Sequence, residues 1–269
     1  IFDYLSVEPQ DWLYGLAYGP GSNAMSWYFR HKLNDELFEY PGYGWLNRYL
    51  AETLNDLPKD KKIVHYSDIT HWIMAQYNVE NPERNIAKSY GRRTWHTRPE
   101  ALYKIFQAIM PFSQGDIIYT EGYHDHFNQY FWHRLLWNPH QTTEEIVKEY
   151  CSIYFGDQAT KSMTKAIFQL EKNFEIPLAT NDGIDRYYAL VKEAGTLIPS
   201  HIMEKDHIWR LHMQKAALDK YIQLKLQREL FQEERIQQLL QQGIESGELN
   251  KVIDKSLSIL TEPRETQVM

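Results

Sequence analysis

The chain has 269 residues and a formal net charge of −7, because 36 acidic side chains face 29 basic ones. This balance argues against a nucleic-acid partner, since no basic domain or stripe is available to neutralise phosphates. The single cysteine, Cys151, excludes an intramolecular disulfide framework and a metal site built from several thiolates.

The beginning of the sequence reads as a strand followed by a helix. A compact apolar run at residues 13–18 predicts a strand, because glycine and proline follow it. Apolar residues at three- and four-residue steps predict a helix over residues 43–57, which Pro58 ends. The first residue is Ile rather than Met, and no basic segment followed by an apolar run comes before the first predicted strand. We therefore expect the start to be a processing or cloning boundary, or the chain to be a fragment of a longer protein.

Two more strands follow, with a helix between them. Residues 62–67 form the second predicted strand and residues 116–119 the third. A helix is predicted to begin at Pro99, which suits the first helical position, and to carry its apolar residues on one face. This alternation of strands and helices is typical of parallel βαβ units.

From Thr142 onward the pattern is helical almost to the end. Thr142 and Glu145 have the spacing of a capping box, and Gly156 is expected to end the helix that they start. Further helices are predicted over residues 159–174, 184–194 and 202–242, and in the last of these Trp209, Leu218 and Ile222 are expected to be buried. No stretch of about 18 apolar residues is present, so the sequence predicts no membrane span.

These elements predict an α/β fold with two parts. Three strands cannot close a (β/α)8 barrel, which needs eight. We therefore expect residues 1–140 to be the C-terminal portion of a TIM-type barrel whose earlier strands are missing from this chain, or else a small open sheet. Residues 141–269 are expected to form an all-helical domain.

Two carboxylates directly follow two of the predicted strands. Asp68 comes after the second strand and Glu121 after the third. Because the carboxyl ends of parallel strands share one face, we expect the two side chains to converge there as a catalytic pair. Glycosidic bond cleavage needs one carboxylic acid and a second carboxylate. The alternative is that each carboxylate caps the helix after it and accepts backbone N–H bonds.

The residues around this pair suit a sugar, whose C–H faces stack on aromatic rings while its hydroxyls take polar groups. We expect the tyrosines to hydrogen-bond a carboxylate, the tryptophans to form subsite walls, and the arginines to hold an anionic or hydroxyl-rich substituent. The alternatives are aromatics that fill the core and arginines that lie on the surface. The predicted substrate-binding residues are Tyr66, His71, Trp72, Arg92, Arg93, Trp95, Tyr119, Tyr123, His124 and Asp125.

The competing chemistry is metal-dependent hydrolysis. His124, Asp125 and His126, with His65 or His71, are residue types that ligate zinc. However, His126 reads as the start of a helix, which would turn its ring about 200° from that of His124. We therefore predict no metal. No cofactor is predicted either, since no glycine-rich loop has the residues that hold a phosphate.

Four short segments carry a resemblance to a known family: Tyr-Ser-Asp-Ile-Thr-His at 66–71, Gly-Arg-Arg at 91–93 with Arg-Pro at 98–99, Tyr-Thr-Glu-Gly at 119–122 and Leu-Trp-Asn-Pro at 136–139. They resemble the C-terminal part of bacterial barrel glycoside hydrolases, in the broad set related to hexosaminidases and α-glucuronidases. The segment that ends at Gly156 resembles the start of the helical domain that follows such barrels. The resemblance covers about residues 13–156.

The resemblance implies that Glu121 and Asp68 are acidic residues at late barrel strands, without fixing their individual roles. It places Trp137 and Asn138 in the segment that leads to the helical domain. It also implies a carbohydrate substrate and favours a periplasmic or extracellular location. Two functions are predicted from these observations: a glycoside hydrolase, or alternatively a non-catalytic carbohydrate-binding or helical interaction module.

Overall fold

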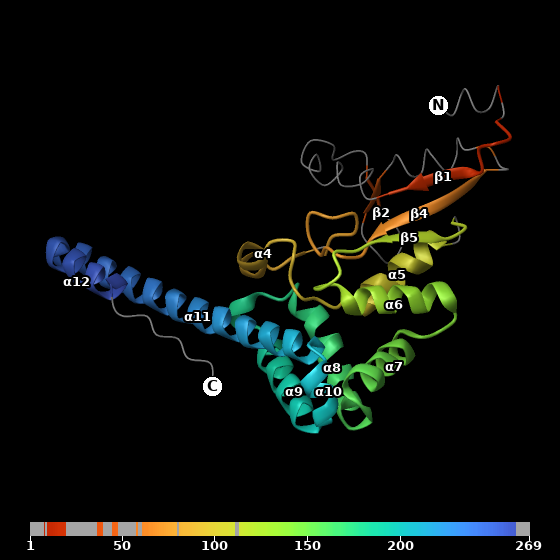
Figure 1. Cartoon of the computed structure of the whole chain (residues 1–269). Helices are drawn as coiled ribbons and strands as arrows, with labels where there is room; N and C mark the ends of the chain where they lie inside the picture. Colours follow the sequence, from red (N-terminus) through yellow and green to blue (C-terminus); the bar gives the residue numbers. More distant parts are fainter. Residues whose placement is uncertain are drawn as a thin grey trace.

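The protein is a mixed α/β chain in which helices predominate, as a computed structural model shows for residues 8, 10–19, 37–39, 45–47, 58, 61–79, 81–110 and 113–261. A small sheet lies at one end and a layer of helices at the other (Figure 1). This confirms the predicted α/β class, and the described residues contain a three-stranded parallel sheet rather than a closed barrel.

The three predicted strands are neighbours and run parallel, as expected. β1 (Gly15–Tyr18), β4 (Lys62–Asp68) and β5 (Asp116–Tyr119) pair in the order β1-β4-β5. Asp68 is opposite Tyr119 in the register, so β4 and β5 end at the same edge of the sheet. The central strand alternates buried and half-buried residues. The two turns that follow β4 and β5 therefore start side by side.

A second sheet corrects one prediction. β2 (Leu37–Glu39) and β3 (Trp45–Asn47) pair antiparallel, with Phe38 opposite Leu46. The helix predicted over residues 43–57 is therefore wrong at Trp45–Asn47, and its other residues lie outside the described ones. Short apolar runs fit a strand as well as a helix, and here the cross-strand pairing decided.

Three of the described helices come before residue 142, and two of them begin at a residue with a clear local cause. α4 (Arg84–Tyr90) is capped by Glu83, whose Oε2 accepts the Ile86 N–H at 2.8 Å. α5 (Pro99–Ile109) has proline at its first position, as predicted. α6 (His126–Trp137) begins at His126, which confirms the predicted helix start there.

Every described element beyond residue 142 is helical, as predicted. Thr142 and Glu145 form the expected capping box, and Gly156, with φ of 81°, ends the first of these helices. The long helix predicted over residues 202–242 is interrupted near residue 206, so it begins later than expected. The elements are α7 (Thr143–Phe155), α8 (Asp157–Asn173), η2 (Leu178–Thr180), α9 (Gly183–Leu197), α10 (Ser200–Lys205), α11 (Ile208–Ser246) and α12 (Leu249–Thr261).

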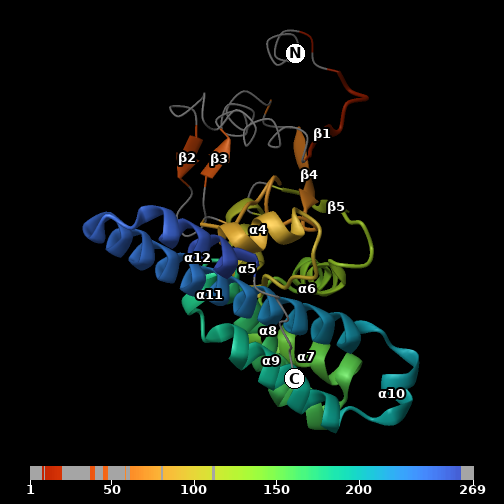
Figure 2. The same cartoon turned by 90° about the vertical axis from the view of Figure 1, so that its left-hand side faces the viewer.

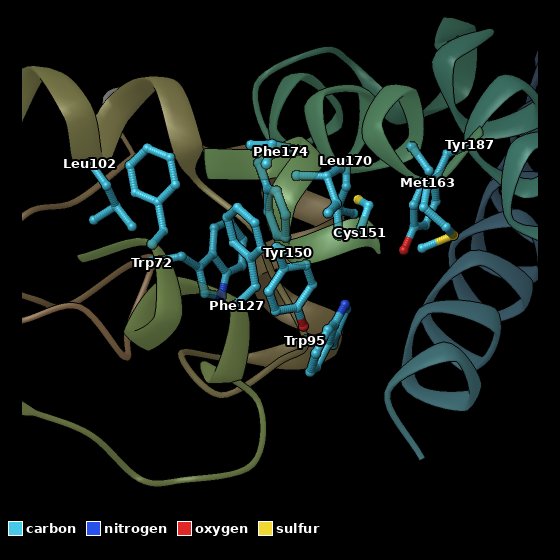
Figure 3. Packing of buried hydrophobic residues seen from close by; sticks show 14 of the residues in the cluster. Trp72, Trp95, Leu102, Phe127, Tyr150, Cys151, Met163, Leu170, Phe174 and Tyr187 are labelled. Carbon is cyan, nitrogen blue, oxygen red and sulfur yellow. The ribbon is translucent and has the colours of Figure 1, made fainter. Parts of the chain in front are cut away.

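One hydrophobic core joins the two parts. It extends from Ile69, after β4, to Ala216 on α11 without a break near residue 140. Trp72 and Phe127 from the first part lie beside Phe174 and Tyr150 from the helical part (Figure 3). Cys151 is buried in the same cluster, and burial raises the pKa of its thiol to about 12. The helical layer therefore supports the turns that follow the strands.

The helix α11 buries polar residues where it lies on the other helices (Figure 2). Lys215 Nζ is 2.5 Å from Asp219 Oδ1, and the Tyr90 hydroxyl donates to the same oxygen at 2.9 Å. Burial lowers the pKa of Lys215, and Asp219 opposes that shift. Because α11 buries the side that carries Lys215 and Asp219, Leu218 points outward. The prediction that Leu218 is buried is therefore wrong, since it is 41% exposed.

Trp209 and Ile222, the other two residues of α11 that were predicted to be buried, are only partly buried and pack against the core. Among the described residues, no helix is both long and apolar enough to cross a membrane.

Candidate functional site

The candidate site lies where β4 and β5 end. Asp68 is the last residue of β4, and Glu121 follows the last residue of β5 by two positions. His71, in the turn after β4, lies between the two carboxylates. Its Nδ1 is 3.0 Å from Asp68 Oδ1, and its Nε2 is 3.2 Å from Glu121 Oε1. The sheet therefore brings the two predicted acids to one edge, but they meet through an imidazole ring rather than directly.

The environment of Asp68 is that of a buried turn cap. Its side chain is only 4% exposed, and Oδ1 accepts the backbone N–H groups of Thr70 at 3.2 Å and His71 at 3.3 Å. The Asp68 N–H in turn donates to Gln76 Oε1 at 2.8 Å. Asp68 Oδ1 thus accepts backbone N–H groups as the capping alternative predicted, but it caps a turn rather than a helix, since the next described helix begins at Arg84.

Glu121 is the member of the predicted pair that reaches solvent. Its side chain is 14% exposed, and Oε2 accepts from Arg93 Nε at 2.8 Å. Oε1 accepts from the Tyr119 hydroxyl at 3.4 Å as well as facing His71. The Arg93 side chain is largely exposed, so its contact with Glu121 lies at the outer side of the site. The guanidinium nitrogen thus makes a short, charge-assisted hydrogen bond with the carboxylate.

Arg92 gives His71 a second hydrogen-bonding arrangement. Its Nη2 is 2.8 Å from His71 Nδ1 and 3.9 Å from Asp68 Oδ2. With a proton on Nδ1, the ring donates to Asp68, and Arg92 is left to pair with the same carboxylate. Without that proton, Nδ1 accepts from Arg92, because a guanidinium has no acceptor. The hydrogen-bond partner of Nδ1 therefore depends on the tautomer of the His71 ring.

Asp125 holds the turn that carries Glu121. Its Oδ2 accepts from the Thr120 hydroxyl at 2.7 Å and from the Glu121 N–H at 3.0 Å, and its Oδ1 accepts from the Gly122 N–H at 3.1 Å. Gly122 has φ of 90°, a conformation that favours glycine. Burial acts to raise the pKa of Asp125, but hydrogen bonds from neighbours such as Thr70 and Thr120 outweigh it and lower that pKa.

His124 and His96 continue from His71 into the core. The His124 ring is 6.2 Å from the His71 ring and 6.1 Å from the His96 ring. His124 Nε2 lies 2.9 Å from the Thr70 carbonyl oxygen, to which it donates. Burial lowers the pKa of His124, and it lowers the pKa of His96 to about 3. His124 and Asp125 were predicted to bind substrate; both are instead buried and hold the two turns in place.

The two predicted subsite tryptophans are in the core. Trp72 is fully buried and donates its Nε1–H to the Gly91 carbonyl at 2.9 Å. Trp95 is also buried, with its ring 4.9 Å from the His212 ring. The prediction that they form walls of a sugar site is therefore wrong. Both rings pack against residues of the helical layer, Trp72 against Phe174 and Trp95 against His212.

Tyrosines supply the aromatic surface at this edge. The rings of Tyr66 and Tyr119 are edge to face at 6.3 Å, and Tyr119 also stacks on the His71 ring at 5.8 Å. Tyr66 and Tyr119 are half-buried, whereas Tyr123 is exposed. The structure thus brings Tyr119, Arg93 and His71 into contact with Glu121, while Tyr66 contacts Tyr119 and Arg92 contacts His71.

The described residues contain no group of three or more His, Cys, Asp or Glu side chains placed to hold a metal ion. His65 is buried in the sheet, where burial lowers its pKa to about 4. His126 Nδ1 is 3.0 Å from the Tyr150 hydroxyl, on the side of the helical layer. Of the histidines weighed as zinc ligands, His71 and His124 have neighbouring rings, whereas His65 lies in the sheet and His126 faces the helical layer.

Sequence reasoning did not identify Gln76 and Gln129. Gln76 supports the Asp68 backbone, and Gln129 donates to Asp125 Oδ1 at 3.1 Å. Neither belongs to a recognisable motif. Gln76 acts on a residue eight positions earlier, whereas Gln129 acts on the N-cap of its own helix, a four-residue spacing that could have marked it.

No family model, curated protein or solved structure matches this chain.

Proposed function

We propose that this chain carries the carboxylate site of a glycoside hydrolase, and that its three parallel strands are late strands of a (β/α)8 barrel. The observation that carries the proposal is the line Asp68–His71–Glu121 at the carboxyl edge of two adjacent parallel strands. In barrel enzymes this edge is where catalytic residues gather. The tyrosines and arginines around Glu121 are suited to hold a hydroxyl-rich ligand.

In this proposal Glu121 acts on the sugar as an ionised carboxylate. Its contact with Arg93 holds the side chain in place, and its partial exposure lets a ligand approach. A charged carboxylate serves as nucleophile, base or stabiliser of the positive charge that develops on the sugar. The general acid that must accompany it is then either a residue outside the described part of the chain or the His71 ring.

Asp68 has a positioning role in this arrangement. Its Oδ1 accepts two N–H groups of the turn, its Oδ2 faces His71 and Arg92, and its side chain is closed to solvent. It fixes the orientation of His71, in the way that a buried carboxylate orients a catalytic histidine elsewhere. We therefore do not propose direct contact between Asp68 and the sugar.

The edge of the sheet supports the barrel part of the proposal. Among the described strands, β5 pairs only with β4. Ile117 on β5 is well exposed. Parallel sheets are normally covered on both faces and paired along their edges, so β5 is suited to receive a further strand.

One observation favours the alternative of a non-catalytic carbohydrate-binding module: only one of the two predicted acids is open to solvent. The two functions make different predictions for the full-length protein. We would assay it with a panel of nitrophenyl glycosides that includes neutral hexosides, N-acetylhexosaminides and uronides, and measure binding of the free sugars by saturation-transfer NMR.

The proposal predicts release of nitrophenol from at least one member of the panel. Binding of sugar without release would favour the non-catalytic module. If the protein neither binds a sugar nor releases nitrophenol from any member of the panel, that result would contradict a sugar site at Glu121.

A further inference from the structure

The end of α11 and the whole of α12 form a two-helix arm that extends away from the sheet (Figure 1). Gly243 of α11 faces Val252 of α12 so closely that a Cβ at Gly243 would be 2.8 Å from Val252 Cγ2. Farther back on α11, Gln232 Nε2 donates to the Ile259 carbonyl at 3.5 Å. The order of these two contacts shows that the helices run antiparallel.

α12 has a second apolar stripe besides the one that contacts α11. Ser256 and Ile259 are buried against α11. Leu249, Ile253 and Leu257 follow each other at four-residue steps, which places them along one side of the helix, and each remains between 39% and 54% exposed. A stripe of large apolar side chains at helical spacing is the pattern of a helix packed on two sides.

α11 contributes to the same side of the arm. At about 100° per residue, Leu230 and Ile244 are rotated by about 110–150° from the line of Gln232 and Gly243. On α12, the exposed stripe is rotated in the same sense from the line of residues that contact α11, which are Val252, Ser256 and Ile259. Because the helices are antiparallel, equal senses of rotation point to one side of the pair. We call these five residues the arm face: Leu230, Ile244, Leu249, Ile253 and Leu257.

We propose that the arm face is an interface through which two copies of this chain associate, so that two arms stack into a four-helix layer. A twofold axis makes one surface complementary to itself, so the arm face alone is sufficient. From Leu230 to Ile244, α11 is about 21 Å long, and two helices side by side are about 20 Å wide. The arm face then offers about 400 Å² per copy, or about 800 Å² in all, which is the size of a weak interface that forms and dissociates readily.

The charge of the arm favours a protein partner over a lipid surface. Residues 225–255 contain five basic and six acidic side chains. Amphipathic helices that bind membranes carry a polar face rich in Lys and Arg, which this composition does not provide. The near balance of charge also means that two arms would repel each other little.

Phe231 provides a matched control on α11. It is 65% exposed, as open as Ile244, but it lies on the opposite side of the helix from the arm face. A glutamate at Ile253 would place a charge in the middle of the proposed interface, whereas a glutamate at Phe231 would leave that interface unchanged. Both positions are solvent-exposed in a single chain, so both variants should fold.

The test is sedimentation equilibrium of the full chain and of its Ile253→Glu and Phe231→Glu variants, with helix content followed by circular dichroism. We expect the wild type, of 32.1 kDa per copy, to form a concentration-dependent dimer. Ile253→Glu should weaken the dimer at least about tenfold at unchanged helix content, and Phe231→Glu should match the wild type.

Three results would overturn the proposal: a wild type that stays monomeric up to its solubility limit, equal association of Ile253→Glu and wild type, or equal weakening by both substitutions. Vesicles of phosphatidylcholine with phosphatidylserine provide the comparison for a lipid surface. Binding to them by a monomeric wild type, lost in Ile253→Glu, would assign the arm face to membranes instead. None of these outcomes depends on the sugar site.

Discussion

His71 Nε2 and Glu121 Oε1 are 3.2 Å apart although the two residues are separated by 50 positions in the sequence. This contact joins the turn after β4 to the turn after β5, and the opposite nitrogen of the same ring faces Asp68. The orientation of the solvent-facing carboxylate is thus coupled to a buried one. The consequence for activity is that a residue out of reach of substrate should still affect turnover.

Replacement of Asp68 by asparagine tests this coupling. Asp68→Asn keeps the shape of the side chain but puts an amide where one oxygen accepts from His71 and its backbone. If the proposed function holds, kcat should fall by about 10², because misplaced catalytic groups lose that much, while KM changes little. Steady-state kinetics on the full-length protein give both constants. A raised KM with unchanged kcat would mean that Asp68 binds the substrate itself.

The buried carboxyl group of Glu171 should make the free energy of unfolding depend on pH. Its carboxylate, on α8, accepts the N–H groups of Glu100 at 3.0 Å and Ala101 at 2.9 Å at the start of α5. Burial raises the pKa of Glu171 from its ordinary value of 4.5 to about 7, against the opposing effect of these N–H groups. Because the folded-state pKa is the higher one, the stabilisation from the protonated group is full below pH 4.5 and is lost as the pH rises through about 7.

The measurement compares the wild type with Glu171→Gln, which stays neutral. The free energy of unfolding of the wild type minus that of the variant should decrease from pH 5 to pH 8, by at most about 3 kcal/mol. Urea denaturation at several pH values gives this difference. The exposed Glu175→Gln serves as control and should show no such trend. A difference for Glu171→Gln that is independent of pH, or that increases with pH, would contradict the prediction.

Local signals in the sequence were enough for much of the fold. The capping box at Thr142, proline at the first position of α5, and the positive φ of Gly156 each act within a few residues. The parallel arrangement of β1, β4 and β5 followed from the alternation of strands and helices. The same order placed Asp68 and Glu121 at one edge of the sheet.

The parts that could not be predicted depend on contacts between distant segments. An apolar or aromatic residue looks the same in sequence whether it lines a site or fills a core, and Trp72 and Trp95 fill the core. The His71 bridge requires two turns to meet in space. On α11, Lys215 and Asp219 form an ion pair with each other. This pairing allows the polar side of the helix to be buried, whereas the apolar side with Leu218 was expected there.

The orientation of α11 gives a stability prediction with an internal control. Leu218 is 41% exposed, so Leu218→Ala should change the free energy of unfolding by no more than about 0.5 kcal/mol. Leu170 is fully buried on α8, and Leu170→Ala should cost about 2–5 kcal/mol. Chemical denaturation of the two variants measures both. Equal losses would mean that α11 presents a different face to the core.

Glu121→Gln tests most directly the proposal that Glu121 is the carboxylate that acts on the sugar. The substitution keeps the shape of the side chain and removes its charge. With an aryl glycoside that the full-length wild type hydrolyses, the account predicts that kcat falls by about 10² or more while binding of the free sugar persists. The exposed Glu193→Gln on α9 should behave as the wild type. Unchanged kcat in Glu121→Gln would contradict the account and place the acting carboxylate elsewhere.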